Sequence, residues 1–202
     1  MDIVAFVVAC IFFSISPGSG AAVSVNNVIV NGFKGASFGI LGLQAALAMH
    51  LVLIYLGIGI LVSQSPILYN LIKYLGIAYL AFLGIEKILS SLRNQANFIK
   101  LGDKKSWLTL MRQGFTVNLT NPKSIIFLTA FLPQFIDIDS NQATQYLLLG
   151  GIVVLVDTLV MFLYSLGASS FRQVLSNEQT IKNVNMVFGV VFIAIAASIA
   201  IQ

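Results

Sequence analysis

The feature that most constrains this chain is a series of six long apolar segments set apart by short polar ones. The segments cover roughly residues 3–25, 36–62, 67–88, 112–136, 144–168 and 184–201. An α-helix needs about 20 predominantly apolar residues to cross a bilayer, so each segment is long enough for one span. Only 9% of the 202 residues are charged, against roughly 25% in soluble proteins, which is too few to cover a water-exposed surface. The pattern predicts an all-α integral membrane protein with six transmembrane helices, and it excludes a soluble enzyme and a nucleic-acid-binding protein.

The positive charges gather on one side of this predicted bundle. The loops that follow the first, third and fifth spans share one side of the membrane, and they hold nine of the eleven Lys and Arg residues. These nine are Lys34, Lys87, Arg93, Lys100, Lys104, Lys105, Arg112, Arg172 and Lys182. The one long loop, about residues 89–111, lies on this side, whereas Asp2, Asp137 and Asp139 lie on the other. By the positive-inside rule, the basic loops face the cytoplasm and both termini face outward.

Two proline-containing motifs occupy comparable places in the first and fourth spans. They read Ser16-Pro17-Gly18-Ser19 and Asn121-Pro122-Lys123-Ser124. Proline lacks a backbone donor and disfavours a helical residue before it, so we expect both helices to be broken there. The two spans cross in opposite directions, and paired interruptions in inverted halves are typical of secondary transporters. The sequence predicts a single transporter domain, residues 1–202, with inverted three-helix repeats over about 1–92 and 112–202.

The second break brings a cation to the middle of the membrane. Lys123 follows Pro122 at the expected start of a half-helix, whose positive dipole end also favours an anion. Asn118 and Asn121 supply polar groups that can satisfy the freed backbone. We expect an anion-binding site here. The alternative is a merely kinked helix whose lysine snorkels to the membrane surface.

The first break places Pro17 and Gly18 in the middle of an apolar segment, with Ser19 beside them. Glycine and proline both interrupt a helix, and the interruption frees backbone N–H groups that can receive a carboxylate. The alternative is a kink at which small residues let two helices approach closely.

An acidic residue, Asp157, lies about midway along the fifth span, where a carboxylate costs roughly 2.5–3.5 kcal/mol to insert. Helical geometry places Gly150, Asp157 and Tyr164 on one face, which we expect to point into the bundle. We interpret Asp157 as a group that binds a proton or an ammonium. The alternative is a structural acid that is hydrogen-bonded to a neighbouring helix.

Two polar residues of the second span, Gln44 and His50, are further candidates for the site. They lie about 120° apart around the helix, so they need not share one site. A histidine within the membrane serves equally well as a structural residue or as a proton relay. With one His and one Cys, Cys10, a transition-metal site would have to rest on carboxylates, so we expect no metal and no other cofactor.

Four short motifs, spread over almost the whole chain, resemble a known family. They are Ser16-Pro17-Gly18-Ser19-Gly20-Ala21, then Ala78-Tyr79-Leu80 with Leu83-Gly84, then Asn118-Leu119-Thr120-Asn121-Pro122-Lys123-Ser124, and then Phe131-Leu132-Pro133-Gln134-Phe135. Together they resemble the LysE/RhtB superfamily of bacterial amino-acid exporters, most members of which have a second proline where this chain has Ser19. Gly42-Leu43-Gln44 and His50 make the chain most similar to the homoserine, homoserine-lactone and threonine exporters of that superfamily.

The resemblance implies efflux of a small neutral amino acid across the bacterial inner membrane, driven by the proton-motive force. The implied partners are the amino-acid substrate, protons and the lipid bilayer, and a homodimer is left open. Two other functions also remain open. An exporter of another solute, such as a divalent cation, predicts that Asp157 binds the metal directly. A non-transporting membrane scaffold predicts that Asp157, Lys123 and the proline breaks are dispensable.

Overall fold

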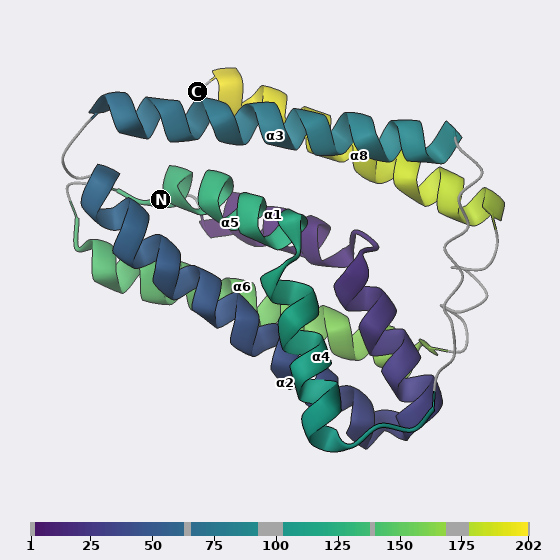
Figure 1. The fold of residues 1–202 in the computed structure, drawn as a ribbon. Helices are drawn as coiled ribbons and strands as arrows, with labels where there is room; N and C mark the ends of the chain where they lie inside the picture. The colour runs from purple at the N-terminus through teal and green to yellow at the C-terminus, as the bar shows by residue number, and fades with distance from the viewer. Residues whose placement is uncertain (1–2, 63–65, 93–102, 138–139, 169–177, 202) are drawn as a thin grey trace.

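The computed structural model describes residues 3–62, 66–92, 103–137, 140–168 and 178–201, and these ranges contain helices and no strand. The helices are α1 (Ile3–Ile15), α2 (Ser19–Val62), α3 (Pro66–Leu92), α4 (Trp107–Leu119), α5 (Pro122–Phe131), α6 (Gln142–Leu166) and α8 (Glu178–Ile201), with a 3-10 turn η1 (Leu132–Phe135) after α5 (Figure 1). The all-α prediction is therefore confirmed over the described ranges. Because α3 continues to Leu92 and α4 begins at Trp107, the connection between them is shorter than the predicted loop of residues 89–111.

Helix α2 consists of two arms that meet at Gly32. This residue has φ 72° and ψ 179°, and such a positive φ favours glycine because it has no Cβ atom. The first arm (residues 19–31) folds back along the second arm (residues 33–62), since a Cβ atom on Gly39 would overlap Asn27. The first apolar segment of the sequence thus forms α1 and the first arm, and the second segment forms the second arm.

Helices α1, α2, α4, α5 and α6 form the larger helix group. Within it, α2 packs against both α4 and α6, and α1 packs against α6 (Figure 1). The contact between α2 and α4 is close, because a Cβ atom on Gly42 would lie 2.8 Å from the backbone nitrogen of Phe115. A Cβ atom on Gly114 would likewise lie 3.0 Å from the backbone nitrogen of Leu43. Glycines therefore let the two backbones touch, as small residues do at helix interfaces in membranes.

Helices α3 and α8 pair with each other and meet the larger group mainly where α3 packs on α5 (Figure 1). Gly84 and Gly189 face each other where α3 and α8 cross. A Cβ atom on Gly84 would lie 2.7 Å from the carbonyl oxygen of Gly189 and 3.1 Å from the nitrogen of Ile193. A Cβ atom on Gly189 would lie 2.7 Å from the carbonyl oxygen of Gly84 and 3.1 Å from the nitrogen of Ile88. The equal distances indicate that this helix pair has local twofold symmetry.

Helix α6 has one apolar exposed side and one buried side. Leu147, Leu155 and Leu163, spaced by eight residues, are 78%, 61% and 59% exposed. Asp157 and Tyr164 are buried on the other side, as the sequence predicts. An exposed row of leucines of this kind suits contact with lipid chains.

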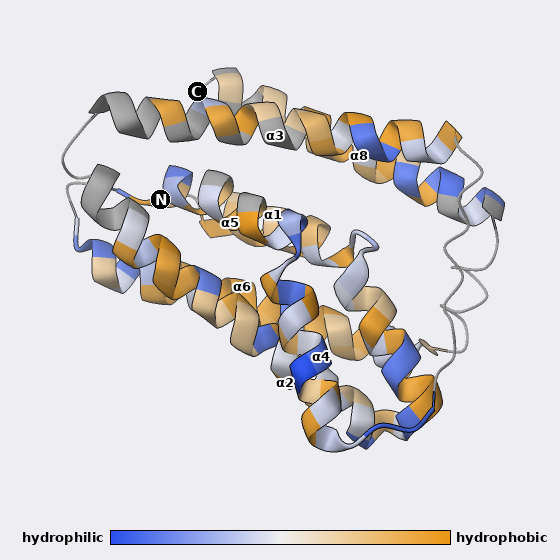
Figure 2. Ribbon diagram, in the orientation of Figure 1, coloured by the Kyte–Doolittle hydropathy of each residue, from blue (hydrophilic) through white to orange (hydrophobic). Residues whose placement is uncertain are grey.

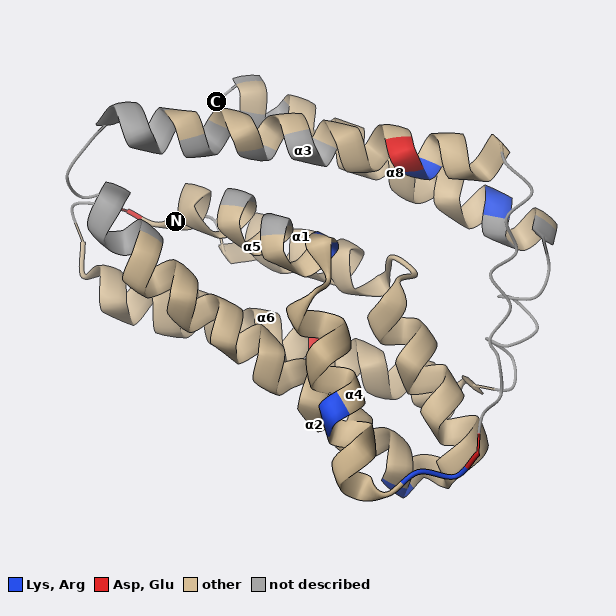
Figure 3. Cartoon of the chain, in the orientation of Figure 1, with Lys and Arg blue, Asp and Glu red and all other residues tan. Residues whose placement is uncertain are grey.

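Two helical stretches of the described chain are long and apolar enough to cross a membrane by themselves. They are Ser19–Gly57 and Gln142–Leu166, and shorter apolar helices occur at Ile3–Ile15 and Lys182–Ala194. Apolar residues cover most of the helices in Figure 2. The charged residues that are coloured along the ribbon in Figure 3 lie mostly toward one end of the helices, in agreement with the asymmetry of charge in the sequence.

Candidate functional site

Two breaks in the helices meet at one cavity inside the larger helix group. Residues 16–18 separate α1 from α2 and form the first break, and residues 120–121 separate α4 from α5 and form the second break. Both lie where the sequence predicts them. Five of the predicted site residues line the cavity, namely Gly18, Asn118, Asn121, Lys123 and Asp157. The cavity volume of about 20 Å³ is room for one water molecule.

The first break presents three successive carbonyl groups that side chains from other helices cap. The Ile15 carbonyl accepts a hydrogen bond from the Tyr164 hydroxyl of α6. The Ser16 carbonyl accepts one from Nζ of Lys123 in α5 at 2.7 Å, and the Pro17 carbonyl accepts one from Nζ of Lys87 in α3 at 3.1 Å. Carbonyls that lose their helical donors inside a membrane need other donors, and here three different helices supply them. Side-chain hydrogen bonds from α3, α5 and α6 therefore all converge on the first break.

The second break is held by its own neighbours. Asn121 caps α5, because its side-chain oxygen accepts a hydrogen bond from the backbone nitrogen of Lys123 at 3.1 Å. The backbone nitrogen of Asn121 donates to the Asn118 carbonyl, and that of Ser124 donates to the Asn121 carbonyl. The backbone amides in the first turn of α5 therefore already have acceptors. The group through which this turn can bind an anion in the cavity is the ammonium of Lys123.

Two side chains tie α2 to the second break. Asn118 is buried, and its amide nitrogen donates to the Leu43 carbonyl while its amide oxygen accepts from the Ser124 hydroxyl, each at 2.7 Å. Nε2 of His50 lies 3.2 Å from the carbonyl oxygen of Leu119, the last residue of α4. Since a carbonyl can only accept, Nε2 carries the proton in this contact. Asn118 and His50 thus fix the position of α2 relative to the end of α4.

The carboxyl group of Asp157 accepts a hydrogen bond from Nε2 of Gln44 at 2.8 Å. Asp157 is only 8% exposed, and the donor to its buried carboxyl group is the neutral amide of Gln44. Gln44 and His50 therefore have different partners, as their separation around the helix predicts. Lys123 and Asp157 line the same cavity, and the Lys123 ammonium also lies 4.7 Å from the centre of the Phe13 ring.

Several buried polar atoms at this site have no hydrogen-bond partner in the described chain. They include Oε1 of Gln44, Nδ1 of His50 and the hydroxyl oxygen of Ser16. Leaving such a group unpaired costs about 1–3 kcal/mol, so a polar guest at the site would be bound favourably.

The other predicted site residues lie around the cavity without lining it. Pro17 contributes its carbonyl group to the first break, and Pro122 begins α5. Ser19 begins α2, and its side chain is exposed.

The structure corrects the interpretation of one basic residue. Lys87 is predicted to be one of the cations of the cytoplasmic loops, but it is a partly buried residue of α3 that donates to the Pro17 carbonyl. Lys87 lies inside the predicted apolar segment of residues 67–88, and this position indicates a residue of the helix rather than of the loop. For Tyr164 the sequence predicts only a place on the interior face of its helix, because spacing along one helix does not indicate a bond to the Ile15 carbonyl of another.

Several known proteins have sequences similar to this chain over almost its whole length. The chain is 37% identical over 196 residues to a homoserine/homoserine lactone efflux protein of Salmonella typhi, with 97% of this chain and 94% of that protein covered. It is 38% identical over 195 residues to a membrane protein of Vibrio cholerae, with 95% and 94% covered. It is 30% identical over 197 residues to a leucine efflux protein of Enterobacter sp. (strain 638), with 96% and 93% covered. No solved structure matches the chain.

The family assignment rests on a match that covers almost the entire chain. Residues 11–202 match the LysE type translocator family, and this range includes both breaks, Gln44, Lys123 and Asp157. The resemblance seen in the sequence is confirmed by this match and by the identity to the efflux protein of Salmonella typhi. The protein is a membrane protein that belongs to the LysE type translocator family.

Proposed function

We propose that this protein is a secondary active exporter of a small neutral amino acid, of the homoserine and threonine class, in a bacterial inner membrane. The observation that carries the proposal is a single cavity lined by an ammonium group, on Lys123, and a carboxyl group, on Asp157. A zwitterionic amino acid carries both complementary charges. The name of the Salmonella typhi relative, a homoserine/homoserine lactone efflux protein, supports the same substrate class.

In this proposal Lys123 binds the carboxylate of the substrate. Its ammonium now donates to the Ser16 carbonyl, a neutral acceptor. A carboxylate is a stronger acceptor for an ammonium than a carbonyl is, so a substrate can take this place. The substrate then breaks the contact between α5 and the first break.

Asp157 and Gln44 bind the opposite end of the substrate. Asp157 accepts from the substrate ammonium, and the unpaired Oε1 of Gln44 accepts either from the ammonium or from a side-chain hydroxyl. A proton on Asp157 competes with the substrate ammonium for the same carboxylate. This competition would couple export to the inward movement of a proton.

The small volume of the cavity indicates a closed conformation. A space of about 20 Å³ holds one water molecule and no amino acid, so the helices around it must separate before a substrate binds. Transporters of this kind alternate access by moving one group of helices against another around a fixed site. The hydrogen bonds of Lys87 and Lys123 to the first break are the contacts that such a movement would break.

An arrangement of six spans in two inverted repeats is part of this proposal. Three pairs of matching residues support it, because each pair is separated by 105 positions: Pro17 and Pro122, Gly84 and Gly189, and Ile88 and Ile193. The glycine and isoleucine pairs are also the ones that meet symmetrically between α3 and α8. The same offset of 105 positions therefore relates the two helix breaks to each other and the crossing point on α3 to the crossing point on α8.

Transport into everted membrane vesicles tests the function directly. We expect vesicles with the protein to accumulate labelled homoserine or threonine when a pH gradient is imposed, and vesicles with Lys123→Met to lose this accumulation. A panel of leucine and divalent cations tests the other substrates. Accumulation of a cation without any amino acid would identify a different exporter, and no transport of any solute would favour a scaffold.

The proposed orientation has its own test. In this proposal the basic loops face the cytoplasm and both termini lie outside it, so a reporter enzyme that is active only in the periplasm should be active when fused after Gln202. A fluorescent protein that folds only in the cytoplasm should stay dark at the same position. The reverse result would invert the orientation without affecting the cavity.

A further inference from the structure

A line of small and polar residues runs along one face of the first arm of α2, away from the cavity. Gly20, Ser24, Asn27 and Asn31 are separated by four, three and four residues, which places them on a single helix face. We call these four residues the polar file. Gly20 lines the cavity, and at the other end the side-chain oxygen of Asn31 accepts a hydrogen bond from the backbone nitrogen of Lys105 at 2.7 Å.

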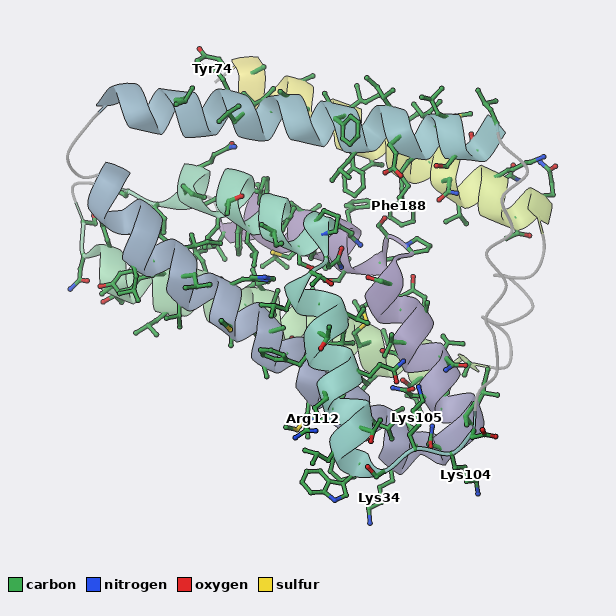
Figure 4. All side chains as sticks on the ribbon, viewed as in Figure 1. Lys34, Tyr74, Lys104, Lys105, Arg112 and Phe188 are labelled. Atoms are coloured by element: carbon green, nitrogen blue, oxygen red, sulfur yellow. The ribbon has the colours of Figure 1, made fainter. Side chains whose placement is uncertain are left out.

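The polar file ends at the basic end of the molecule. Lys34, Lys104, Lys105 and Arg112 lie together at this end in Figure 4, beside the turn between the two arms of α2. The file therefore connects the cavity to the side of the protein that the positive-inside rule places in the cytoplasm.

The middle of the polar file holds a buried amide without a partner. Asn27 is only 1% exposed, and neither its side-chain nitrogen nor its side-chain oxygen has a hydrogen-bond partner in the described chain. The side-chain oxygen of the neighbouring Asn26 is also buried and unpaired. Burying an unpaired amide loses its interaction with water without a replacement. A water molecule or a polar solute beside Asn27 would supply the missing hydrogen-bond partners.

Opposite the polar file, the second arm of α2 presents glycines instead of side chains. A Cβ atom on Gly39 would overlap the Asn27 amide, and one on Gly35 would overlap the side chain of Asn31. The carbonyl oxygen of Leu110 in α4 lies 3.9 Å from the Cβ position at Gly39. Asn27 therefore lies against the backbone of Gly39 with no side chain between them, so separation of the two arms would expose its amide.

We propose that the polar file is the closed cytoplasmic half of the substrate path, and that a polar solute passes Asn27 on its way to the cavity. This inference rests on the proposed export function, because it supplies the route by which that substrate reaches Lys123 and Asp157. The unpaired amide of Asn27 offers the passing solute both a donor and an acceptor.

Cysteine accessibility tests the path without measuring transport. In a Cys10→Ala background, Asn27→Cys is compared with Val25→Cys, which is equally buried at 0% exposure but lies on another face of the same arm. In everted vesicles, a membrane-impermeant anionic methanethiosulfonate should modify Asn27→Cys about tenfold faster than Val25→Cys, because only the first position opens to water. Equal, slow modification of both cysteines would overturn the inference.

A second pair of variants guards against misfolding of the cysteine variants. Asn27→Leu keeps the size of the side chain and removes its unpaired polar groups, so a purely structural residue would give equal or greater thermal stability and unchanged transport. We expect Asn27→Leu to lower homoserine efflux about tenfold while its melting temperature is maintained, and Asn27→Ser to retain most of the efflux. Wild-type efflux by Asn27→Leu would contradict the path.

The two tests also separate this inference from the proposed function. If the protein transports no amino acid but Asn27→Cys is still modified rapidly from the basic end, the proposed substrate is wrong and the polar path stands. If wild-type protein exports homoserine but Asn27→Cys stays unreactive, the function stands and the path lies elsewhere.

Discussion

The two helix breaks look alike in sequence, yet they are stabilised in opposite ways. The carbonyls of the first break are capped by Tyr164, Lys123 and Lys87, which lie 149, 107 and 70 residues away from their acceptors. The second break is capped mainly within its own turn, by the side chain and backbone of Asn121, although His50 of α2 also donates to the Leu119 carbonyl. A local cap stays with its helix, whereas a distant donor is lost when helices separate. We therefore expect the first break to move during transport and the second to carry Lys123 as a fixed element.

The largest effect is expected from Lys123→Met, which removes the cation from the cavity and the donor from the Ser16 carbonyl. Removing one partner of a buried charged interaction typically costs 2–5 kcal/mol, so the initial rate of export should fall by about 100-fold or more. Methionine keeps much of the packing volume, so the protein should still insert and remain folded.

Two comparisons sharpen that test. Lys123→Arg should also transport poorly, because a broad planar guanidinium does not fit the place of a compact ammonium. An amino-acid amide, which lacks the carboxylate, should lose less transport than homoserine does when Lys123 is replaced. Wild-type export by Lys123→Met would mean that the lysine only stabilises the first break.

Asp157→Asn tests whether Asp157 couples transport to the proton gradient or only holds α6 against α2. The amide keeps an oxygen that can accept from Nε2 of Gln44, so the bond between α6 and α2 should persist and both breaks should keep their caps. Because the amide cannot exchange a proton, we expect this variant to stop concentrating substrate in response to an imposed pH gradient. Exchange of labelled for unlabelled homoserine in reconstituted vesicles should continue. If the gradient still drives accumulation, Asp157 is structural, and coupling rests on another group such as His50.

The difference between the breaks also explains what the sequence could predict. Proline chemistry locates both breaks and the start of α5 at Pro122, because these effects act over a few residues. Helical periodicity puts Asp157 and Tyr164 on an interior face for the same reason. The partners of the first break could not be predicted, since nothing local to Lys87 indicates that it reaches Pro17. The bond between Gln44 and Asp157 likewise depends on how α2 lies against α6.

Lys87→Met tests whether the first break needs all of its distant donors. It removes the cap of the Pro17 carbonyl but leaves Lys123 in the cavity, so binding of the substrate carboxylate should be preserved. We expect export to fall by about 3- to 10-fold, in keeping with the loss of one hydrogen bond inside a membrane. Homoserine and its amide should be affected by the same factor, in contrast to Lys123→Met. A selective loss for homoserine would show that Lys87 contacts the substrate carboxylate, and Lys87→Arg should recover part of the rate.

The smallest effects come from removing one hydroxyl at each break. Tyr164→Phe deletes the donor to the Ile15 carbonyl, a long-range contact, and should destabilise the protein by about 1 kcal/mol. For a chain of this size that corresponds to a melting temperature about 2–4 °C lower. Thr120→Val deletes an exposed hydroxyl that bonds the Thr116 carbonyl within its own turn, so the change should stay within about 0.5 kcal/mol. Thermal unfolding in detergent, measured side by side, compares the two. A larger loss for Thr120→Val than for Tyr164→Phe would reverse the assignment of the second break as the locally stabilised one, and with it the expectation that the first break is the part that moves.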